Sequence, residues 1–364
     1  MSYKVFQLEP YVGQEELANL TKSINDGWLT EGPFSKKFIE GVKDMTGAKH
    51  ALLAANGTLA LYLMYLAIGI EPGDEVICPS FTFNATASPL AIIGAKPVFV
   101  DIKEDDLQID PEMIEAVITP KTKAIVPVHI YGQSCDMDPI MEIAKKHNLL
   151  VIEDAAQGFG VFYKEKHTGT IGHCGMISFF ADKTITCGEG AVVLTNDDEL
   201  FEKLKLVRNQ GRPNSGTFIH PSLGMNFRMT DLQCGVGVAQ LAKFPEIKER
   251  KTKNFELYHA WLKDVPQVKF VGLSKDSNFI PFRVNIRVER LEELLQFMED
   301  NQLQTRRLFY PLHKQPCYSY LGYQENDFPV ANKAYDEGLS LPVHLGLKRE
   351  DIELICDTII SFYG

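Results

Sequence analysis

Short apolar runs rich in β-branched residues alternate with helix-like stretches between about positions 50 and 200. This alternation is typical of βαβ units, whose strands lie side by side in a mostly parallel sheet. The expected strands are 51–54, 75–78, 97–101, 124–129, 149–153, 176–179 and 191–195. Because these runs are almost continuously apolar, we expect both faces of the sheet to be buried.

After about residue 240 the pattern changes. A long charged helix is expected at 244–263, and it is followed by strands at 268–272 and 281–288 and by helices at 290–301 and 349–362. This order predicts a smaller α+β domain, so we divide the chain into a large α/β domain (1–240) and a small C-terminal domain (241–364). The first thirty or so residues are expected to form an arm that packs onto the large domain.

Composition narrows the class of protein. A chain of 364 residues, 45% of them hydrophobic, can bury a core large enough for two domains. A formal net charge of −11 and a sequence pI of about 5.4 argue against nucleic acid as a partner, because binding phosphates needs a basic surface. Seven cysteines without a C-x-x-C pair indicate reduced thiols and a cytoplasmic protein. We expect no membrane helix, since no apolar stretch reaches the roughly 20 residues that one needs.

Four segments carry candidate chemistry, and each lies where an expected strand ends, which is where open α/β sheets bind ligands. The first is 55–58. Gly57 allows a sharp turn, and the free N–H groups and dipole of the helix that starts near Thr58 attract an anion such as a phosphate. An ordinary capped turn is the more common origin of such a segment, because Asn and Thr are frequent capping residues.

The second and third segments contain the candidate reactive groups. Asp154 follows the strand 149–153, where a carboxylate can pair with the protonated ring nitrogen of a pyridine cofactor. Lys183 lies in a Gly- and Thr-rich loop, where partial burial can lower the pKa of an amine and allow it to form a Schiff base. Ser178, just before this loop, is a candidate for the phosphate. Taken singly, Asp154 is also explained as the cap of the next loop, and Lys183 as a solvated surface charge.

The fourth segment is 224–233. Thr230 and Gln233 form a capping-box pattern, which predicts the start of a helix. Asn226 and Arg228 lie in the loop before that helix. By themselves these two residues are equally explained as ordinary turn and surface positions.

Eight segments together share the order and spacing of the motifs of one known family. They are 56–58, 72–76, 79–83, 128–133, 154–157, 178–190, 225–230 and 309–313. On these motifs the chain resembles the DegT/DnrJ/StrS family of sugar aminotransferases over nearly its whole length. The resemblance implies a fold-type-I transferase that depends on pyridoxal 5′-phosphate and works as a homodimer with active sites at the subunit interface.

The resemblance also assigns roles by position. Lys183 would hold the cofactor covalently, and Asp154 would pair with its pyridine nitrogen. Gln157 would approach the phenolic oxygen of the cofactor, Phe83 would stack on its ring, and Asn226 would reach the phosphate of the cofactor in the partner subunit. The residues expected to bind the phosphate within the same subunit are Gly57, Thr58 and Ser178.

The implied reaction is an amino transfer in two halves. L-glutamate would displace Lys183 from the cofactor, and the freed amine would move a proton before 2-oxoglutarate leaves. A nucleotide-linked keto sugar would then accept the amino group by the reverse steps. Family members that dehydrate sugars carry histidine in place of this lysine, so dehydration is disfavoured here.

Within the family, the segment 118–157 and the loop of Lys183 are most similar to perosamine synthases. Those enzymes act on a GDP-linked 4-keto-6-deoxy sugar, GDP-4-keto-6-deoxymannose, and the resemblance favours this substrate and a place in O-antigen or other glycan synthesis. The chain departs from that group at Gln157, where an acid is common, and from the usual Gly-Glu-Gly-Gly motif at Ala191. UDP- or dTDP-linked 4-keto sugars, and amination at C3, therefore stay open.

A nucleotide diphosphate needs cations near the sugar site. Arg306, Arg307 and His313 are candidate contacts to the diphosphate and the sugar, since the arginine fork matches phosphate geometry. The basic end of a surface helix is an equal alternative for this segment.

Two other classes of protein are weighed against an aminotransferase. A regulator that binds the cofactor or a sugar without turnover is one, but the acidic chain has no basic helix-turn-helix pattern for DNA. A metalloenzyme is the other. His129, His173 and Cys174 show no recognisable ligand spacing, so we expect packing or loop roles for them and no metal site.

Overall fold

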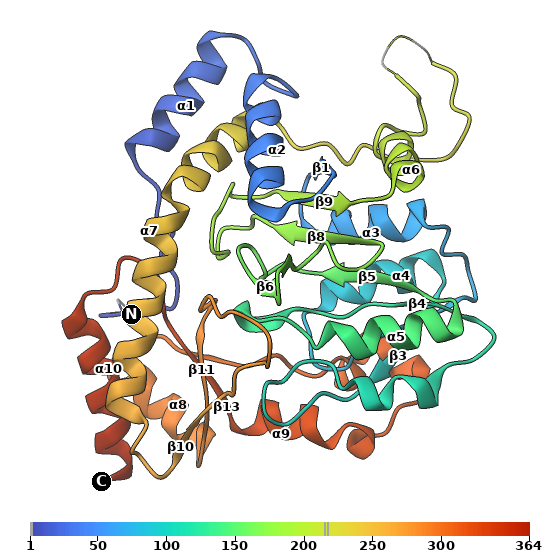
Figure 1. Cartoon of the computed structure of the whole chain (residues 1–364). Coiled ribbons are helices and arrows are strands. Elements are labelled where there is room, and N and C mark those ends of the chain that lie inside the picture. The colour runs from blue at the N-terminus through green and yellow to red at the C-terminus, as the bar shows by residue number, and fades with distance from the viewer. Residues whose placement is uncertain (1–2, 215, 217) are drawn as a thin grey trace.

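Two lobes joined by one long helix make up the chain (Figure 1). The computed structural model describes residues 3–214, 216 and 218–364. A seven-stranded sheet with helices on both faces forms the large lobe, and a four-stranded sheet with packed helices forms the small lobe. Among the described residues, no helix is long and apolar enough to cross a membrane.

The large sheet has the mostly parallel arrangement that the alternating pattern predicts. Its strand order is β1-β9-β8-β5-β4-β2-β3, in which only β9 runs against its neighbours. The strands are β1 (His50–Ala54), β2 (Glu75–Pro79), β3 (Lys96–Val100), β4 (Thr122–Ile125), β5 (Leu150–Asp154), β8 (Cys174–Ser178) and β9 (Ala191–Thr195). All seven predicted strands are confirmed, although β4 ends at Ile125 and Val128 beyond it makes only an isolated bridge.

Helices cover both faces of this sheet, as its apolar strands require. One face packs against α3 (Gly57–Ala67), α4 (Ser88–Ile93) and α6 (Asp198–Arg208). The other packs against α2 (Pro33–Thr46), α5 (Met137–His147) and the first half of α7. Because β1, β2, β4, β5 and β8 run in the same direction, their carboxyl ends lie at one edge of the sheet.

The small lobe is an antiparallel sheet of order β10-β11-β13-β12. Its strands are β10 (Val268–Phe270), β11 (Val284–Val288), β12 (Arg306–Arg307) and β13 (Gly338–Leu341). Its helices are α8 (Leu291–Asp300), α9 (Pro329–Glu337) and α10 (Arg349–Tyr363). A separate apolar core joins α8, α10 and the end of α7 to this sheet, so the predicted α+β character is confirmed.

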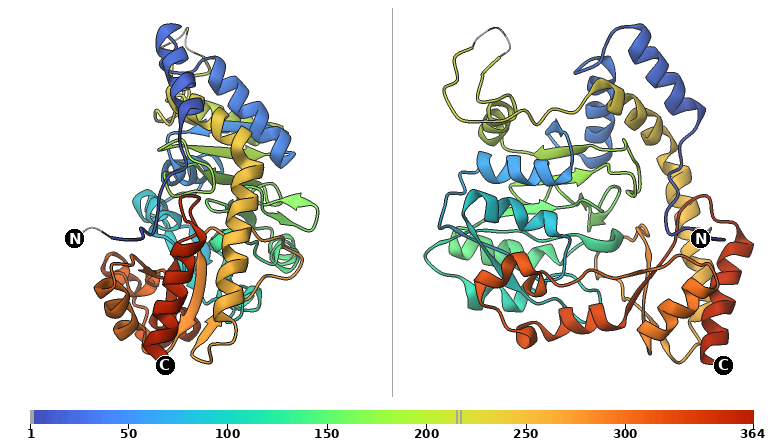
Figure 2. Two further views of the ribbon diagram at one scale, coloured as in Figure 1. Left: turned by 90° about the vertical axis from the view of Figure 1, so that its left-hand side faces the viewer. Right: turned by 180° about the vertical axis from the view of Figure 1, so that it is seen from behind.

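The helix α7 (Asp231–Leu262) runs through both lobes (Figure 2). Thr230 caps it by accepting the Gln233 N–H at 3.2 Å, while the Gln233 side chain accepts the Thr230 N–H at 2.9 Å, which confirms the predicted capping box. The helix continues past Pro245, although proline lacks the N–H that an interior turn needs. Position 240, where we divide the domains, therefore lies inside one continuous helix.

The N-terminal arm contacts the small lobe as well as the start of α7, where Asn19 donates to the Gly235 carbonyl. Val5 pairs with Leu303 of the small lobe, and the Gln304 side chain accepts the Gln7 N–H at 2.9 Å. After this stretch, α1 (Gln14–Asn25) packs along α7. The start of the arm thus contacts the small lobe, because backbone groups near Leu303 are available for hydrogen bonds. The pattern of apolar residues does not reveal such backbone contacts.

Shorter elements complete the chain. They are the hairpin β6 (Phe162–Tyr163) and β7 (Lys166–His167), and 3₁₀ turns at Asn84–Thr86, Pro111–Met113, Glu115–Val117, Ile130–Gly132, Leu312–Lys314, Pro316–Leu321 and Glu325–Asp327.

Candidate active site

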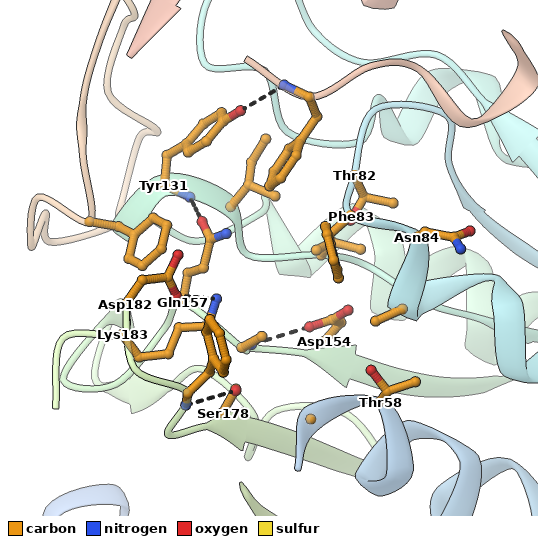
Figure 3. Close-up of a pocket in the computed structure, with 18 of the residues that line it drawn as sticks. Thr58, Thr82, Phe83, Asn84, Tyr131, Asp154, Gln157, Ser178, Asp182 and Lys183 are labelled. Atoms are coloured by element: carbon orange, nitrogen blue, oxygen red, sulfur yellow. Dashed lines mark hydrogen bonds and ion pairs between the residues drawn. The ribbon is translucent and has the colours of Figure 1, made fainter. Parts of the chain in front are cut away.

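A cavity of about 970 Å³ lies where the carboxyl edge of the large sheet meets the small lobe (Figure 3). Segments that follow β1, β2, β4, β5 and β8 line one side of it. Residues 282–283 and 306–310 of the small lobe line the other side. This is the position in which open α/β sheets bind ligands, because the topology collects several strand ends there.

The start of α3 forms an end of the cavity suited to an anion. Asn56 caps the helix by accepting a backbone N–H from its first turn at 2.9 Å. The first N–H groups of a helix have no partner within it, and Gly57 and Thr58 line the cavity at these positions. A Cβ built on Gly57 would lie 2.9 Å from Met176 Cε and 3.2 Å from Ser178 Cβ, so only glycine keeps this space open. The hydroxyls of Thr58 and Ser178 complete a cradle that fits a phosphate.

A buried carboxylate lies further into the cavity. Asp154 ends β5, and its Oδ2 accepts the Thr86 hydroxyl at 2.8 Å while its Oδ1 accepts the Ala156 N–H at 3.2 Å. Burial raises the pKa of Asp154 above its ordinary value, although these hydrogen bonds and the charge of Lys183 oppose the rise. A carboxylate held in this way pairs strongly with a protonated ring nitrogen, since charge-assisted hydrogen bonds strengthen away from water.

The residue before Asp154 fixes the end of β5. Glu153 is fully buried, contacts His129 Nε2 at 2.9 Å and accepts three backbone N–H groups from the loop 169–172. Because successive side chains of a strand point to opposite faces, this anchor leaves Asp154 directed into the cavity. The packing role expected for His129 is confirmed.

The side chain of Lys183 enters the cavity from the loop between β8 and β9 (Figure 3). Its Nζ lies 4.8 Å from the centre of the Phe282 ring and 3.4 Å from Asp182 Oδ1. Burial lowers the pKa of Lys183, while the carboxylates of Asp182 and Asp154 oppose that shift. A lysine with a lowered pKa is more often neutral near pH 7, and the neutral amine is the nucleophile.

Two further side chains border the space between Lys183 and Asp154. Gln157 Oε1 accepts the backbone N–H of Tyr131 at 2.6 Å, which fixes the Gln157 side chain. Tyr131 adopts φ 60°, a left-handed conformation that is uncommon for a bulky residue and is typical of functional sites. Phe83 stands across the cavity in Figure 3, 64% exposed, with its ring available for stacking.

Three arginines of the small lobe line the same cavity: Arg283, Arg306 and Arg307. Arg283 Nη2 lies 2.9 Å from Asp182 Oδ2, and Arg307 is paired with Glu292. Arg306 and Arg307 form the strand β12, so the alternative of a helix end is wrong. This side of the cavity suits a ligand with several negative charges, because guanidinium groups match phosphate oxygens.

The structure brings most, but not all, of the expected site residues together. Those that line the cavity are Gly57, Thr58, Phe83, Asp154, Gln157, Ser178, Lys183 and Arg306. His313 does not line it. Its Nδ1 lies 2.6 Å from Ser80 Oγ, its Nε2 lies 3.3 Å from the Glu325 carbonyl oxygen, and its ring is buried, so protein groups already use both nitrogens. Asn226 is exposed and lies outside the cavity of its own chain.

Among the residues of the cavity wall to which the sequence assigns no role are Tyr131 and Asp182, which lie within the motifs 128–133 and 178–190, and Arg283, which lies in no motif. The only feature of the sequence that singles out Arg283 is its charge, which lies between two apolar residues in an expected strand. Nothing local indicates that it meets Asp182, because the two residues are 101 positions apart in the chain.

Fold and site together define a class of enzyme. The phosphate cradle at Gly57, the buried carboxylate of Asp154 and the amine of Lys183 fit the phosphate, the ring nitrogen and the aldehyde of pyridoxal 5′-phosphate. When bound, this cofactor supplies an electron sink that stabilises negative charge on the carbon beside a substrate nitrogen. The chain is therefore a fold-type-I enzyme that depends on pyridoxal 5′-phosphate.

The chain belongs to the DegT/DnrJ/EryC1/StrS aminotransferase family, whose family model matches residues 10–360. It is 39% identical to GDP-perosamine synthase of Caulobacter vibrioides over 354 residues, which cover 95% of each chain. It is 36% identical to UDP-2-acetamido-2-deoxy-3-oxo-D-glucuronate aminotransferase of Pseudomonas aeruginosa over 347 residues, covering 94% of this chain and 95% of that relative. DesV of S. venezuelae, solved in complex with a ketimine intermediate, superposes with a TM-score of 0.91 at 31% identity, covering 96% of this chain and 94% of DesV.

These findings confirm the resemblance and settle the class of activity. The chain is an aminotransferase, and pyridoxal 5′-phosphate is its cofactor. Within the described part of the chain, no three His, Cys, Asp or Glu side chains are grouped as a metal site.

Proposed function

We propose that this enzyme transfers the amino group of L-glutamate to C4 of a nucleotide-linked 4-keto-6-deoxy sugar. GDP-4-keto-6-deoxymannose is the favoured acceptor, which would make GDP-perosamine the product. The 39% identity to GDP-perosamine synthase over 95% of both chains carries this proposal. We place the reaction in the cytoplasm, in the supply of amino sugars for O-antigen or other bacterial-type glycans.

Three residues of the cavity have a role in both halves of the proposed reaction. Lys183 Nζ would hold the cofactor at rest and, once freed by the amino donor, would take a proton from the donor Cα and return it to the cofactor carbon on the other side of the transferred nitrogen. Asp154 keeps the ring nitrogen protonated, and Gln157 borders the ring edge. After 2-oxoglutarate leaves, the keto sugar takes up the amino group by the reverse sequence, so we expect ping-pong kinetics.

In this proposal, arginines of the small lobe bind the acceptor, the nucleotide-linked sugar. Arg306 lines the cavity beside Phe309 and Tyr310, which gives a cation for a diphosphate and aromatic surface for a sugar or base. We expect Arg306→Ala to raise KM for the nucleotide sugar by about tenfold or more, since a hydrogen bond to a charged group contributes about 1.5–3 kcal/mol. KM for glutamate should stay near that of the wild type. His313 is left out of this contact set because its ring nitrogens face Ser80 and Glu325.

A panel of keto sugars tests the proposed substrate. Purified enzyme with L-glutamate is offered GDP-, UDP- and dTDP-linked 4-keto-6-deoxy sugars at equal concentration, and kcat/KM is measured for each. The proposal expects the highest kcat/KM for the GDP-linked sugar, with the new amine at C4 by NMR. A clear preference for a UDP- or dTDP-linked sugar would overturn the nucleotide assignment while leaving the class of reaction intact.

A second acceptor has its own support. The P. aeruginosa relative, 36% identical over nearly the whole chain, is named for a UDP-linked 3-oxo sugar acid. Amination at C3 of a UDP-linked sugar is therefore the alternative. A UDP-linked 3-keto sugar belongs in the panel, and the position of the new amine decides between C3 and C4.

The proposal includes a homodimer with shared active sites. Asn226 lies outside the cavity of its own chain, in a segment with strongly exposed apolar side chains. Phe218 is 87% exposed and Leu223 is 95% exposed, and apolar side chains in such a patch are usually covered by a partner. A second copy of the chain seated there would bring its Asn226 to the phosphate end of the first copy's cavity.

Mixing two inactive variants tests this arrangement. Lys183→Ala and Asn226→Ala are each expected to lose activity as pure proteins. Mixed in equal amounts and allowed to exchange subunits, half of the dimers are hybrids with one intact site, so about a quarter of the wild-type activity should return. A mixture that is no more active than the sum of its parts would overturn the shared site.

A further inference from the structure

The residue next to the cavity lysine connects it to the small lobe. Asp182 directly precedes Lys183, and its side chain is nearly buried. Its Oδ2 accepts a hydrogen bond from Arg283 Nη2 at 2.9 Å, and its Oδ1 lies 3.4 Å from Lys183 Nζ. One carboxylate therefore lies between the amine of Lys183 and an arginine that directly precedes β11 of the small lobe.

One oxygen of this carboxylate has no hydrogen-bond donor. Asp182 Oδ1 is buried and accepts no hydrogen bond from any residue in the described part of the chain. A buried carboxylate oxygen without a donor is unfavourable, so such atoms are rare outside functional sites. Lys183 Nζ lies within ion-pair distance of this oxygen, although the distance is longer than that of a good hydrogen bond. Lys183 is therefore the nearest candidate donor.

Titratable groups from both lobes line the cavities that Lys183 borders. The titratable residues that line the two cavities bordered by Lys183 are, on the large lobe, the arm and α7, Glu9, Tyr11, His129, Tyr131, Asp154, Asp182, Glu189 and Lys251, and, on the small lobe, Arg283, Arg306, Arg307, Tyr310 and His344. Burial and the charge of Arg283 lower the pKa of Lys183, whereas Asp182 and Asp154 raise it. Lys251 donates to the Pro281 carbonyl at 3.3 Å and adds positive charge behind Asp182.

From this geometry we propose that Asp182 and Arg283 form a positioning pair that sets how firmly Lys183 Nζ holds its proton. Asp182 retains the proton on Nζ, and Arg283 weakens that hold by neutralising the same carboxylate. Since Arg283 belongs to the small lobe, contact between the lobes is coupled to the acid–base state of the lysine. The inference rests on Lys183 as the lysine that carries the cofactor, which is itself part of the proposed function.

The titration of Lys183 tests the pair without any turnover. In the full-length, cofactor-free protein, the rate at which acetic anhydride modifies Lys183 is followed by peptide mass spectrometry as a function of pH. Asp182→Asn should lower the midpoint by about one pH unit or more, because an opposite charge at this distance is lost. Arg283→Met should raise it, because a like charge is removed and Asp182 is freed to face Lys183. Arg283→Lys, which keeps the charge, should return the midpoint toward that of the wild type.

Matched variants of exposed ion pairs serve as controls. Asp138→Asn and Arg290→Met remove the same charges from the pairs Lys164–Asp138 and Arg290–Glu293, which do not line the cavity, and should leave the midpoint of Lys183 unchanged. An unchanged midpoint in Asp182→Asn, or shifts of the same sign in Asp182→Asn and Arg283→Met, would overturn the inference. If circular dichroism shows that one variant does not fold, the other variant still tests the inference. Each variant has its own expected direction for the shift of the Lys183 midpoint.

Failure of this inference is distinct from failure of the proposed function. If Lys183→Ala still binds the cofactor and transfers amino groups, the role of Lys183 is wrong whatever the labelling shows. If the labelling midpoints do not move as expected while Lys183→Ala is inactive, the pair is merely structural and the aminotransferase account stands.

Discussion

Asp154 and Lys183 respond to burial in opposite directions within one cavity. Burial raises the pKa of Asp154 and lowers that of Lys183, so each is held closer to its neutral form than it would be in water. A protonated ring nitrogen beside Asp154 lowers the pKa of this carboxyl again. The site then holds a charged pair away from solvent. These two shifts are typical of residues that do chemistry.

Replacing the carboxylate at position 154 tests its electrostatic role. We expect Asp154→Asn to lower kcat by about 10²-fold or more, because a preorganised charge is lost, while the amide still accepts the Thr86 hydroxyl and preserves the fold. Thr86→Val keeps the carboxylate and removes one hydrogen bond, so it should cost only about tenfold. Steady-state kinetics and thermal unfolding of both variants provide the check. Wild-type kcat in Asp154→Asn would remove Asp154 from the mechanism.

Gly57 gives a second prediction, on cofactor affinity. The added Cβ of Gly57→Ala would lie 2.9 Å from Met176 Cε and 3.3 Å from Ser178 Oγ, inside the phosphate cradle. We expect the Kd for pyridoxal 5′-phosphate to rise by about tenfold or more, as overpacking costs about 1–3 kcal/mol. Absorbance titration of the cofactor-free protein measures it. Gly235→Ala, whose Cβ would make an ordinary 3.4 Å contact with Asn19, is the control and should bind as the wild type does.

At the scale of elements, local patterns predict the strands of the large sheet well, because buried parallel strands are short and almost wholly apolar. They predict α7 less well. The capping box at Thr230 marks its start and the charged run 244–263 marks its second half, but Pro245 between them would ordinarily end or kink a helix. Packing against α1, α2 and α10 holds α7 as one helix, and such tertiary contacts leave no local signal.

Lys251 on α7 is a charge buried at the junction of the two lobes. Burial lowers its pKa to about 8, and its amine donates to the Pro281 carbonyl. In the unfolded chain the pKa of lysine is about 10.4. Between these two values the unfolded chain binds more protons than the native protein, so this residue makes stability rise as pH rises through the window.

Lys251→Met should remove this pH dependence. We expect the unfolding free energy of the wild type, minus that of the variant, to increase by about 2.5 kcal/mol from pH 8 to about pH 10.4. Urea denaturation at several pH values measures the difference. Lys253→Met removes an exposed lysine of the same helix, paired with Glu249, and should give a difference that is flat with pH. A flat difference for Lys251→Met would contradict the burial of a charged amine.

At the scale of the whole molecule, the sequence predicts the fold class and most of the site for one physical reason. Gly57, Asp154 and Ser178 each stand at or just beyond a strand end, and the sheet topology gathers those ends at one edge. Contacts between the lobes follow no such rule. The pairing of Asp182 with Arg283 depends on how the two lobes pack, and local sequence does not carry that information.

The central claim is that Lys183 carries the cofactor of a working aminotransferase. The most direct test is the visible absorption spectrum of the purified protein before and after L-glutamate, for wild type and Lys183→Ala. The account predicts a visible band from lysine-linked cofactor in the wild type, its loss when glutamate is added, and its absence in Lys183→Ala. A cofactor-supplemented wild type without this band, or with a band that glutamate never changes, would contradict the account.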